Sequence, residues 1–169
     1  MIDVIDEIIF FEKAISFLNE IGIETAYNTI SDEDCFLPGL LILNGKIFID
    51  KNKIKFYGDV LHEAAHIAVV PSADRNKLNG VDIGKRKDAA AEEMMAIAWS
   101  YAACVHLNLD PHFVFHENGY KGGGDSIVKN FEAGNYMGVP VLQWLGMTTT
   151  SKEAGNKFIY PAMIKWLRD

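Results

Sequence analysis

The sequence is poor in cysteine, which limits the roles open to its thiols. Cys35 and Cys104 are the only cysteines in 169 residues, and they form neither a CxxC pair nor any other spacing typical of a metal site. The sequence therefore excludes a zinc cluster built from cysteines. Two distant thiols are typical of a reducing compartment, in which we expect them to stay free.

Positive charge and long apolar runs are also scarce. Sixteen lysines and arginines face 23 aspartates and glutamates, a net charge of −7, which argues against a basic face for the phosphates of nucleic acid. The longest apolar run, Met94 to Val105, contains Ser100 and is too short to span a bilayer. The acidic N-terminal segment lacks the small-residue cleavage site of a signal peptide. We expect a cytoplasmic protein that binds neither nucleic acid nor a membrane.

The composition is otherwise that of an ordinary globular protein, with 49% apolar and 23% charged residues. A chain of this length can bury a core without disulfides. Because no repeat, low-complexity tract or linker divides it, we predict one domain over residues 1–169. The sequence does not indicate an oligomeric state.

The sequence contains a strong hairpin signal in its first third. Two β-prone runs, Leu40 to Leu43 and Lys46 to Ile49, are joined by Asn44-Gly45. Both turn residues tolerate the positive φ that a type I′ turn needs, so the pattern predicts an antiparallel pair.

Helical spacing of apolar residues accounts for most of the remaining elements. A helix from residue 60 to 70 is expected to end at Pro71, and Asp88 is a good N-cap for a helix from 89 to 107. Further helices are expected from the N-terminus to about residue 19, at 125–132 and at 162–167, with a polar loop at 72–87. The core is expected to contain four large aromatic residues: Trp99, Tyr101, Trp144 and Trp166. Together these elements predict an α+β fold.

The chemistry is concentrated in the helical segment His62-Glu63-Ala64-Ala65-His66. Positions i, i+1 and i+4 of a helix lie within about one third of its circumference. His62 and His66 can therefore hold one Zn²⁺ ion, and Glu63 is close enough to take a proton from water at that ion. We predict His62 and His66 as metal ligands and Glu63 as the general base.

A catalytic zinc site of this type needs a third protein ligand and an open fourth position. The next helix carries Glu92 and Glu93 in its first turn. Acidic residues there also stabilise the positive end of a helix, so one of the two can serve only that role. We expect the other to turn toward the metal.

The region from Leu40 to Ala103 resembles the ImmA/IrrE-type metallopeptidases. In that family a hairpin or strand leads into the His-Glu-x-x-His helix, and a glutamate on a helix somewhat under thirty residues later supplies the third ligand. Here Glu93 follows His66 by 27 positions. The resemblance implies that Glu93 is the ligand and Glu92 the helix cap.

Two positions depart from the family pattern, because Ala65 replaces its usual glycine and Met95 its usual Asn or Asp. The Leu-Met-Pro ending of the family's ligand helix is also missing. The resemblance implies a zincin-like fold, in which a small sheet or hairpin packs on the active-site helix and on a second, ligand-bearing helix. It also implies cleavage of a peptide or protein inside the cell.

A second group of unusual residues lies between Asp110 and Asp125. His116 is an alternative third ligand, or it could hydrogen-bond the oxyanion of a tetrahedral intermediate together with Tyr120. The alternative that we favour is that both are satisfied polar groups in a structured loop. The alternation of aromatic residues with the histidines indicates an extended segment. Gly122 to Gly124 is expected to form a flexible rim of the substrate cleft.

The residues favour two functions over a third, a zinc hydrolase of a small amide or deformylase-like substrate. Deformylases keep a cysteine ligand in a glycine-leucine segment, a pattern that Cys35 to Gly39 lacks. The first of the two favoured functions is a zinc-dependent metallopeptidase, and the second is a catalytically inactive, zinc-stabilised binding or regulatory module with a peptidase-like fold. Glu63 favours the first, because a structural zinc site gains nothing from a glutamate between its two histidines.

Overall fold

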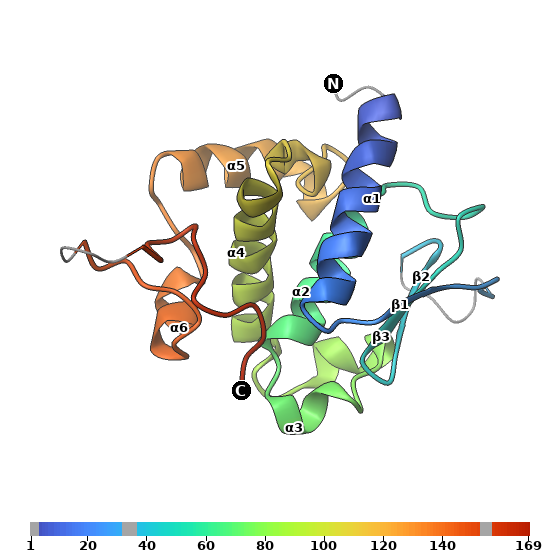
Figure 1. The fold of residues 1–169 in the computed structure, drawn as a ribbon, viewed down its shortest axis with the longest axis horizontal. Helices are drawn as coiled ribbons and strands as arrows, with labels where there is room; N and C mark the ends of the chain where they lie inside the picture. The colour runs from blue at the N-terminus through green and yellow to red at the C-terminus, as the bar shows by residue number, and fades with distance from the viewer. Residues whose placement is uncertain (1–3, 32–36, 153–156) are drawn as a thin grey trace.

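Two long helices, α2 (Asp59–Val69) and α4 (Ala89–Leu107), pack against each other at the centre of the fold (Figure 1). The computed structural model describes residues 4–31, 37–152 and 157–169. Both central helices lie within one residue of their predicted bounds. α2 ends where Val70 takes an extended conformation ahead of Pro71, and Asp88 stands at the N-cap of α4 without a side-chain cap bond.

A small mixed sheet lies on one side of the helix pair, opposite α5 and α6 (Figure 1). Its strand order is β1-β3-β2, with β1 (Thr25–Tyr27) parallel and β2 (Leu40–Leu43) antiparallel to β3 (Lys46–Ile49). The predicted hairpin is confirmed, because Leu43 pairs with Lys46 and the two residues between them have φ values of 51° and 72°. β1 was not predicted, since it is short and half-exposed and pairs in parallel with a distant strand.

The first helix, α1 (Val4–Glu20), covers the outer side of α2 and the sheet (Figure 1). Phe11, Ala14 and Leu18 are buried at helical spacing, as its periodicity predicted. The chain leaves the helix through Gly22, whose φ of +93° favours glycine. The chain is therefore α+β, with the strands of the sheet supported by helices on one side.

Shorter elements complete the fold. They are α3 (Ser72–Arg75), the 3₁₀ helices η1 (Gly80–Lys85) and η2 (Pro111–Phe113), the turn η3 (Tyr120–Gly122), α5 (Gly124–Glu132) and α6 (Val139–Trp144). α5 was predicted within one residue. Residues 72–87 hold α3 and η1, so the prediction of a simple loop there is wrong. The predicted extended segment at 112–116 instead begins with a 3₁₀ turn, because Asp110 accepts a hydrogen bond from the backbone N–H of His112.

The predicted helix at 162–167 does not form. Met163 pairs with Thr148, and the backbone N–H of Ile164 donates to Met147 at 2.8 Å. The N–H groups of Ile164 and Lys165 thus both donate to the distant Met147 carbonyl rather than to carbonyls four residues earlier.

Three of the four expected core aromatics are buried or packed against the core: Trp99, Tyr101 and Trp166. The prediction for Trp144 is wrong, because 81% of its surface is exposed. The short helix α6 buries Val139 and Leu142. Trp144, two positions beyond Leu142, therefore points to the opposite side of that helix.

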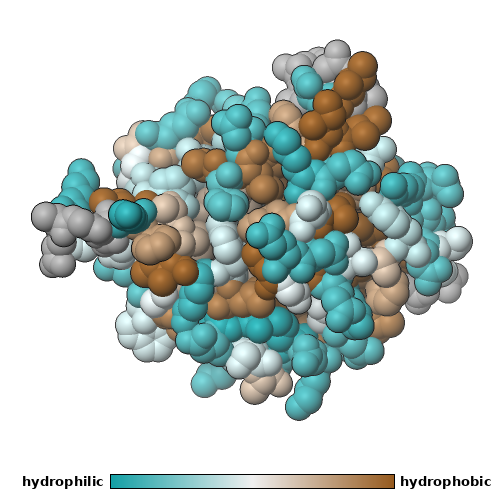
Figure 2. Space-filling view, viewed as in Figure 1, coloured by the Kyte–Doolittle hydropathy of each residue, from teal (hydrophilic) through white to brown (hydrophobic). Residues whose placement is uncertain are grey.

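Hydrophilic side chains cover most of the face seen in Figure 2, and an apolar ridge follows the N-terminal part of α1. Ile8 and Ile9 contribute to this ridge and are each about half exposed. Of the helices in the described ranges, none combines the length and apolar character needed to cross a membrane.

Candidate metal centre

α2 brings the two motif histidines together. His62 and His66 lie one helical turn apart, and their Nε2 atoms are 3.2 Å from each other. Burial lowers the pKa of His62 to about 3, helped by repulsion from His66, and burial lowers the pKa of His66 to about 4. Both imidazoles are therefore neutral near pH 7 and can offer a nitrogen lone pair.

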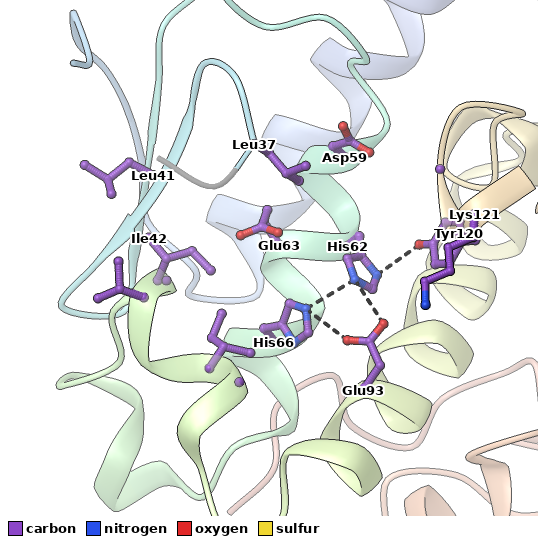
Figure 3. Close-up of a pocket in the computed structure, with 15 residues that line it drawn as sticks. Leu37, Leu41, Ile42, Asp59, His62, Glu63, His66, Glu93, Tyr120 and Lys121 are labelled. Carbon is purple, nitrogen blue, oxygen red and sulfur yellow. Dashed lines mark hydrogen bonds and ion pairs between the residues drawn. The ribbon is translucent and has the colours of Figure 1, made fainter. Parts of the chain in front are cut away.

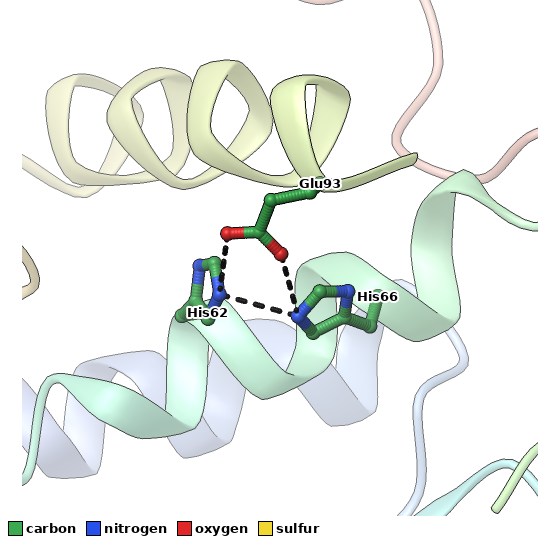
Figure 4. A group of neighbouring side chains, drawn as sticks. All are labelled: His62, His66 and Glu93. Carbon is green, nitrogen blue, oxygen red and sulfur yellow. Dashed lines mark hydrogen bonds and ion pairs between the residues drawn. The ribbon is translucent and has the colours of Figure 1, made fainter. Parts of the chain in front are cut away.

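α4 supplies a carboxylate opposite this pair, as Figure 4 shows. Glu93 Oε1 lies 3.6 Å from His62 Nε2, and Oε2 lies 3.5 Å from His66 Nε2. The three side chains form a group whose ligand atoms all lie within 4.8 Å of one another. Partial burial raises the pKa of Glu93, so its carboxylate would be stabilised by a nearby positive charge.

The spacing of these donors fits a tetrahedral zinc ion. Zinc binds nitrogen and oxygen ligands at about 2.0–2.1 Å, so two ligands at the tetrahedral angle lie about 3.3–3.4 Å apart. The separations between His62, His66 and Glu93 are 3.2, 3.5 and 3.6 Å. The two distances to Glu93 involve different oxygens, Oε1 for His62 and Oε2 for His66, and with one donor atom per residue the three donors lie within 4.8 Å of one another. One Glu93 oxygen would therefore have to move closer to the histidines to complete a tetrahedral set.

Glu92 lies beside Glu93 in sequence but has a different partner. Its carboxylate is buried and accepts two hydrogen bonds from Arg86, from Nε at 2.7 Å and from Nη2 at 3.0 Å. Arg86 also donates to Asp74 at 3.0 Å. The expectation that Glu92 acts only as a helix cap is therefore wrong, because its main partner is the guanidinium of Arg86. Neither is it directed at the histidines.

His116 is held away from the histidine pair. Its Nε2 lies 3.1 Å from Asp59 Oδ1, and its ring stacks on Phe56 with the centroids 4.0 Å apart. Asp59 occupies the first turn of α2. The structure thus engages His116 with the start of α2 and does not bring it to His62 and His66.

Tyr120 does reach the site, but through a histidine. Its hydroxyl lies 3.0 Å from His62 Nδ1, and its ring stands edge-on to the imidazole (Figure 3). Burial, together with nearby carboxylates such as Glu93, holds the pKa of Tyr120 well above its usual range. The phenol therefore keeps its proton and touches the side of His62 that faces away from Glu93.

A cavity of about 810 Å³ opens beside the three side chains. Its apolar wall consists of side chains from the sheet side and from η1: Leu37, Leu41, Ile42, Val81 and Ile83. The rim contains Gly119 to Lys121, whereas Gly122 to Gly124 do not line it. The prediction that the glycine run forms the rim is therefore wrong by a few residues.

Glu63 lines the same cavity, next to the histidines on α2 (Figure 3). Burial raises its pKa to about 8, and repulsion from Asp59 and Glu93 adds to the rise. Among the described residues that line the cavity, Lys121 is the only cation. A divalent ion at the histidines would offset the electrostatic repulsion between Glu63, Asp59 and Glu93.

Sequence reasoning missed Asp59 and Lys121 as residues of this cavity. Asp59 could have been found, because it lies four positions before Glu63 and so shares its face of the helix. Lys121 left no such signal, since it reaches the cavity from a turn 58 positions after Glu63.

The chain matches no family model, no curated protein and no solved structure. Its function must therefore be argued from the geometry and chemistry of the residues themselves.

Proposed function

We propose that this chain is a zinc-dependent metallopeptidase that hydrolyses a peptide or protein in the cytoplasm. One observation carries the proposal: the donor atoms of His62, His66 and Glu93 converge at ligand spacing beside Glu63 in an open cavity. Two imidazoles and a carboxylate are a ligand set that zinc accepts in hydrolytic sites.

The three side chains would hold the ion and leave one coordination position open toward the cavity. When bound, zinc would polarise a substrate carbonyl and lower the pKa of the attacking water to about 7. His62 and His66 are neutral near pH 7, so neither has to lose a proton before it binds.

Glu63 would act as the general base once a positive ion at the histidines has lowered the pKa of its carboxyl. One of its carboxylate oxygens takes the proton from the attacking water and later gives it to the leaving amine nitrogen. Burial raises the pKa of Glu63 to about 8 in the protein without metal. A positive ion at the histidines would lower that pKa toward 7, so that the carboxylate can accept the proton. Efficient proton transfer needs a base whose pKa lies near the working pH.

An inactive, zinc-stabilised module is the competing function. A structural zinc site is normally closed by four protein ligands. In the described part of the chain the group consists of three side chains, and a cavity of about 810 Å³ lies beside it. Glu63 lines that cavity as a non-ligand carboxylate, which supports catalysis rather than a purely structural role.

We further propose that the site is zincin-like and related to that of the ImmA/IrrE-type metallopeptidases. The β2–β3 hairpin precedes the helix that carries His62 and His66, and Glu93 comes from the helix packed against it. These features support the resemblance seen in the sequence.

The decisive experiment combines metal analysis with hydrolysis of a peptide library. We expect about one zinc per chain in the parent, none in His62→Ala, and full occupancy in Glu63→Gln. Hydrolysis should fall 100- to 10,000-fold in Glu63→Gln, because a general base is lost. Glu132→Gln on the exposed side of α5 is the matched control and should behave as the parent. A Glu63→Gln variant with full activity would refute the peptidase mechanism.

A further inference from the structure

The turn η3 carries an unusual backbone at the edge of the cavity. Tyr120, Lys121 and Gly122 have φ values of 51°, 55° and 79° in succession. Glycine adopts this left-handed conformation freely, but a non-glycine residue does so only at a cost in free energy. Two such residues in a row persist only where surrounding contacts hold them, and such strain is concentrated at functional sites.

Two contacts fasten this part of the chain to α2. Tyr120 meets His62 at 3.0 Å, and His116, four positions earlier, meets Asp59 at 3.1 Å. Asp59 and His62 are three residues apart, so both contacts fall on the same face of α2. Gly124 then passes so close to Phe115 that a Cβ on it would lie 2.2 Å from the Phe115 carbonyl oxygen. The loop is thus closed on itself and tied to the helix that carries the histidines.

The two histidines differ in what their second nitrogen contacts. The Nε2 atoms of both face Glu93, so each imidazole would carry its proton on Nδ1 when Nε2 binds a metal. His62 Nδ1 has the Tyr120 hydroxyl as its partner, whereas no described residue hydrogen-bonds the buried Nδ1 of His66. In Figure 3 a dashed line joins the Tyr120 hydroxyl to the imidazole of His62. Tyr120 is therefore the only protein group that fixes the tautomer of either histidine among the residues described.

We propose that Tyr120 is a positioning residue for the metal: its hydroxyl oxygen accepts a hydrogen bond from His62 Nδ1–H, which directs Nε2 at the ion, and the strained turn η3 holds the phenol in place. The inference rests on the proposed zinc site. It assigns Tyr120 to orienting the metal ligand His62, rather than to contacting the substrate. Such outer partners of a ligating histidine orient the ring and raise its basicity.

Coupling of this kind is reciprocal. If Tyr120 strengthens zinc binding, zinc binding must strengthen the hold of His62 on Tyr120 by the same factor. Zinc binding should therefore order the turn that carries Tyr120 and Lys121. If Tyr120 raises zinc affinity tenfold, zinc binding stabilises the His62–Tyr120 contact by about 1.4 kcal/mol.

The test measures zinc affinity by competition with a chromogenic chelator. Tyr120→Phe keeps the ring and removes only the hydroxyl, and we expect it to weaken zinc binding 10- to 100-fold. Tyr160→Phe is the matched control, because it also removes a buried phenol, one that donates to the Ala98 carbonyl at 2.8 Å. The control should lower the thermal midpoint while it leaves zinc affinity unchanged. Equal affinity of Tyr120→Phe and the parent would overturn the proposal.

Amide hydrogen exchange of the parent and of Tyr120→Phe provides a second readout. Zinc should slow exchange at Gly119 to Gly124 relative to α6, and Tyr120→Phe should abolish that difference. Unchanged exchange in this segment on zinc binding overturns the role of Tyr120 and leaves the metal site standing. A parent chain that binds no zinc overturns both, so the two failures are distinguishable.

Discussion

Glu92 and Glu93 are adjacent on α4, yet their carboxylates contact different partners on different sides of the helix. Glu92 is buried in a two-point contact with Arg86, whereas Glu93 faces the imidazoles of His62 and His66. Adjacent residues on a helix point about 100° apart, so a single helix can serve both partners. Arg86 thereby holds the first turn of α4, from which Glu93 faces His62 and His66.

The two glutamates should therefore respond differently to removal of their charge. Glu93→Gln should weaken zinc affinity at least tenfold with little change in the stability of the metal-free protein. Glu92→Gln should leave Arg86 without its buried counter-charge and lower the free energy of unfolding by roughly 1–3 kcal/mol. Urea unfolding with a chelator present, together with zinc titration, separates the two effects. A loss of zinc affinity in Glu92→Gln larger than in Glu93→Gln would contradict this assignment.

Zinc uptake should release a proton from Glu63. The pKa of its carboxyl is about 8 in the protein without metal, so the group is mostly protonated at pH 7. A divalent ion at the histidines lowers that pKa and displaces the proton. Zinc affinity should thus rise with pH up to about 8, while His62 and His66, with pKa values of about 3 and 4, contribute no protons above pH 5.

Calorimetry in two buffers of different ionisation enthalpy measures that release. The parent should release nearly one proton more than Glu63→Gln at pH 7, and the difference should vanish above pH 9. Equal release by the two proteins at pH 7 would show that Glu63 is already ionised.

The raised pKa of Glu63 should also make the stability of the metal-free protein depend on pH. The pKa of Glu63 is near its ordinary value of 4.5 in the unfolded chain and about 8 in the folded one. The folded protein therefore binds more protons between these values, and its stability falls as pH rises through that window. Without metal at pH 9, Glu63→Gln should be more stable than the parent by roughly 1–3 kcal/mol. At pH 4.5 the difference should be close to zero, because Glu63 is then protonated in the folded parent. Chemical unfolding at both pH values checks the sign.

Gly58 is required by a close backbone approach at the start of α2. A Cβ there would lie 1.7 Å from the Phe113 carbonyl oxygen. Gly58→Ala should therefore push η2 away from α2 and lower the free energy of unfolding by roughly 1–3 kcal/mol. At Gly84 a Cβ would meet nothing within 4 Å, so Gly84→Ala should change stability by less than about 0.5 kcal/mol. Thermal unfolding of the two variants side by side tests the pair.

Local sequence was sufficient for the elements whose signals lie within a few residues. Asn44-Gly45 predicted the hairpin because a two-residue turn depends on the φ preferences of those two residues. The bounds of α4 followed from periodicity and an N-cap within its own segment. The proximity of His62 and His66 has the same origin, since a single helical turn brings their Nε2 atoms to 3.2 Å.

Segments that pair with distant parts of the chain could not be predicted in this way. β1 exists because β3 offers a parallel partner, with Thr25 opposite Ile47. Residues 162–167 have a helical pattern, yet their backbone bonds to Met147. In both cases a partner more than ten residues away decided the conformation, and tertiary contacts override weak local propensity.

The sequence by itself determined the core of the candidate site, because the spacing of His62, Glu63 and His66 on one helix places two nitrogen donors and a carboxylate side by side. Only the tertiary structure decided what completes it. The packing of α4 on α2 turns Glu93 toward the histidines while Arg86 binds Glu92, and the strained turn η3 brings Tyr120 to His62 across 58 positions. Those choices depend on how helices and loops distant in sequence pack, which no local pattern of residues encodes.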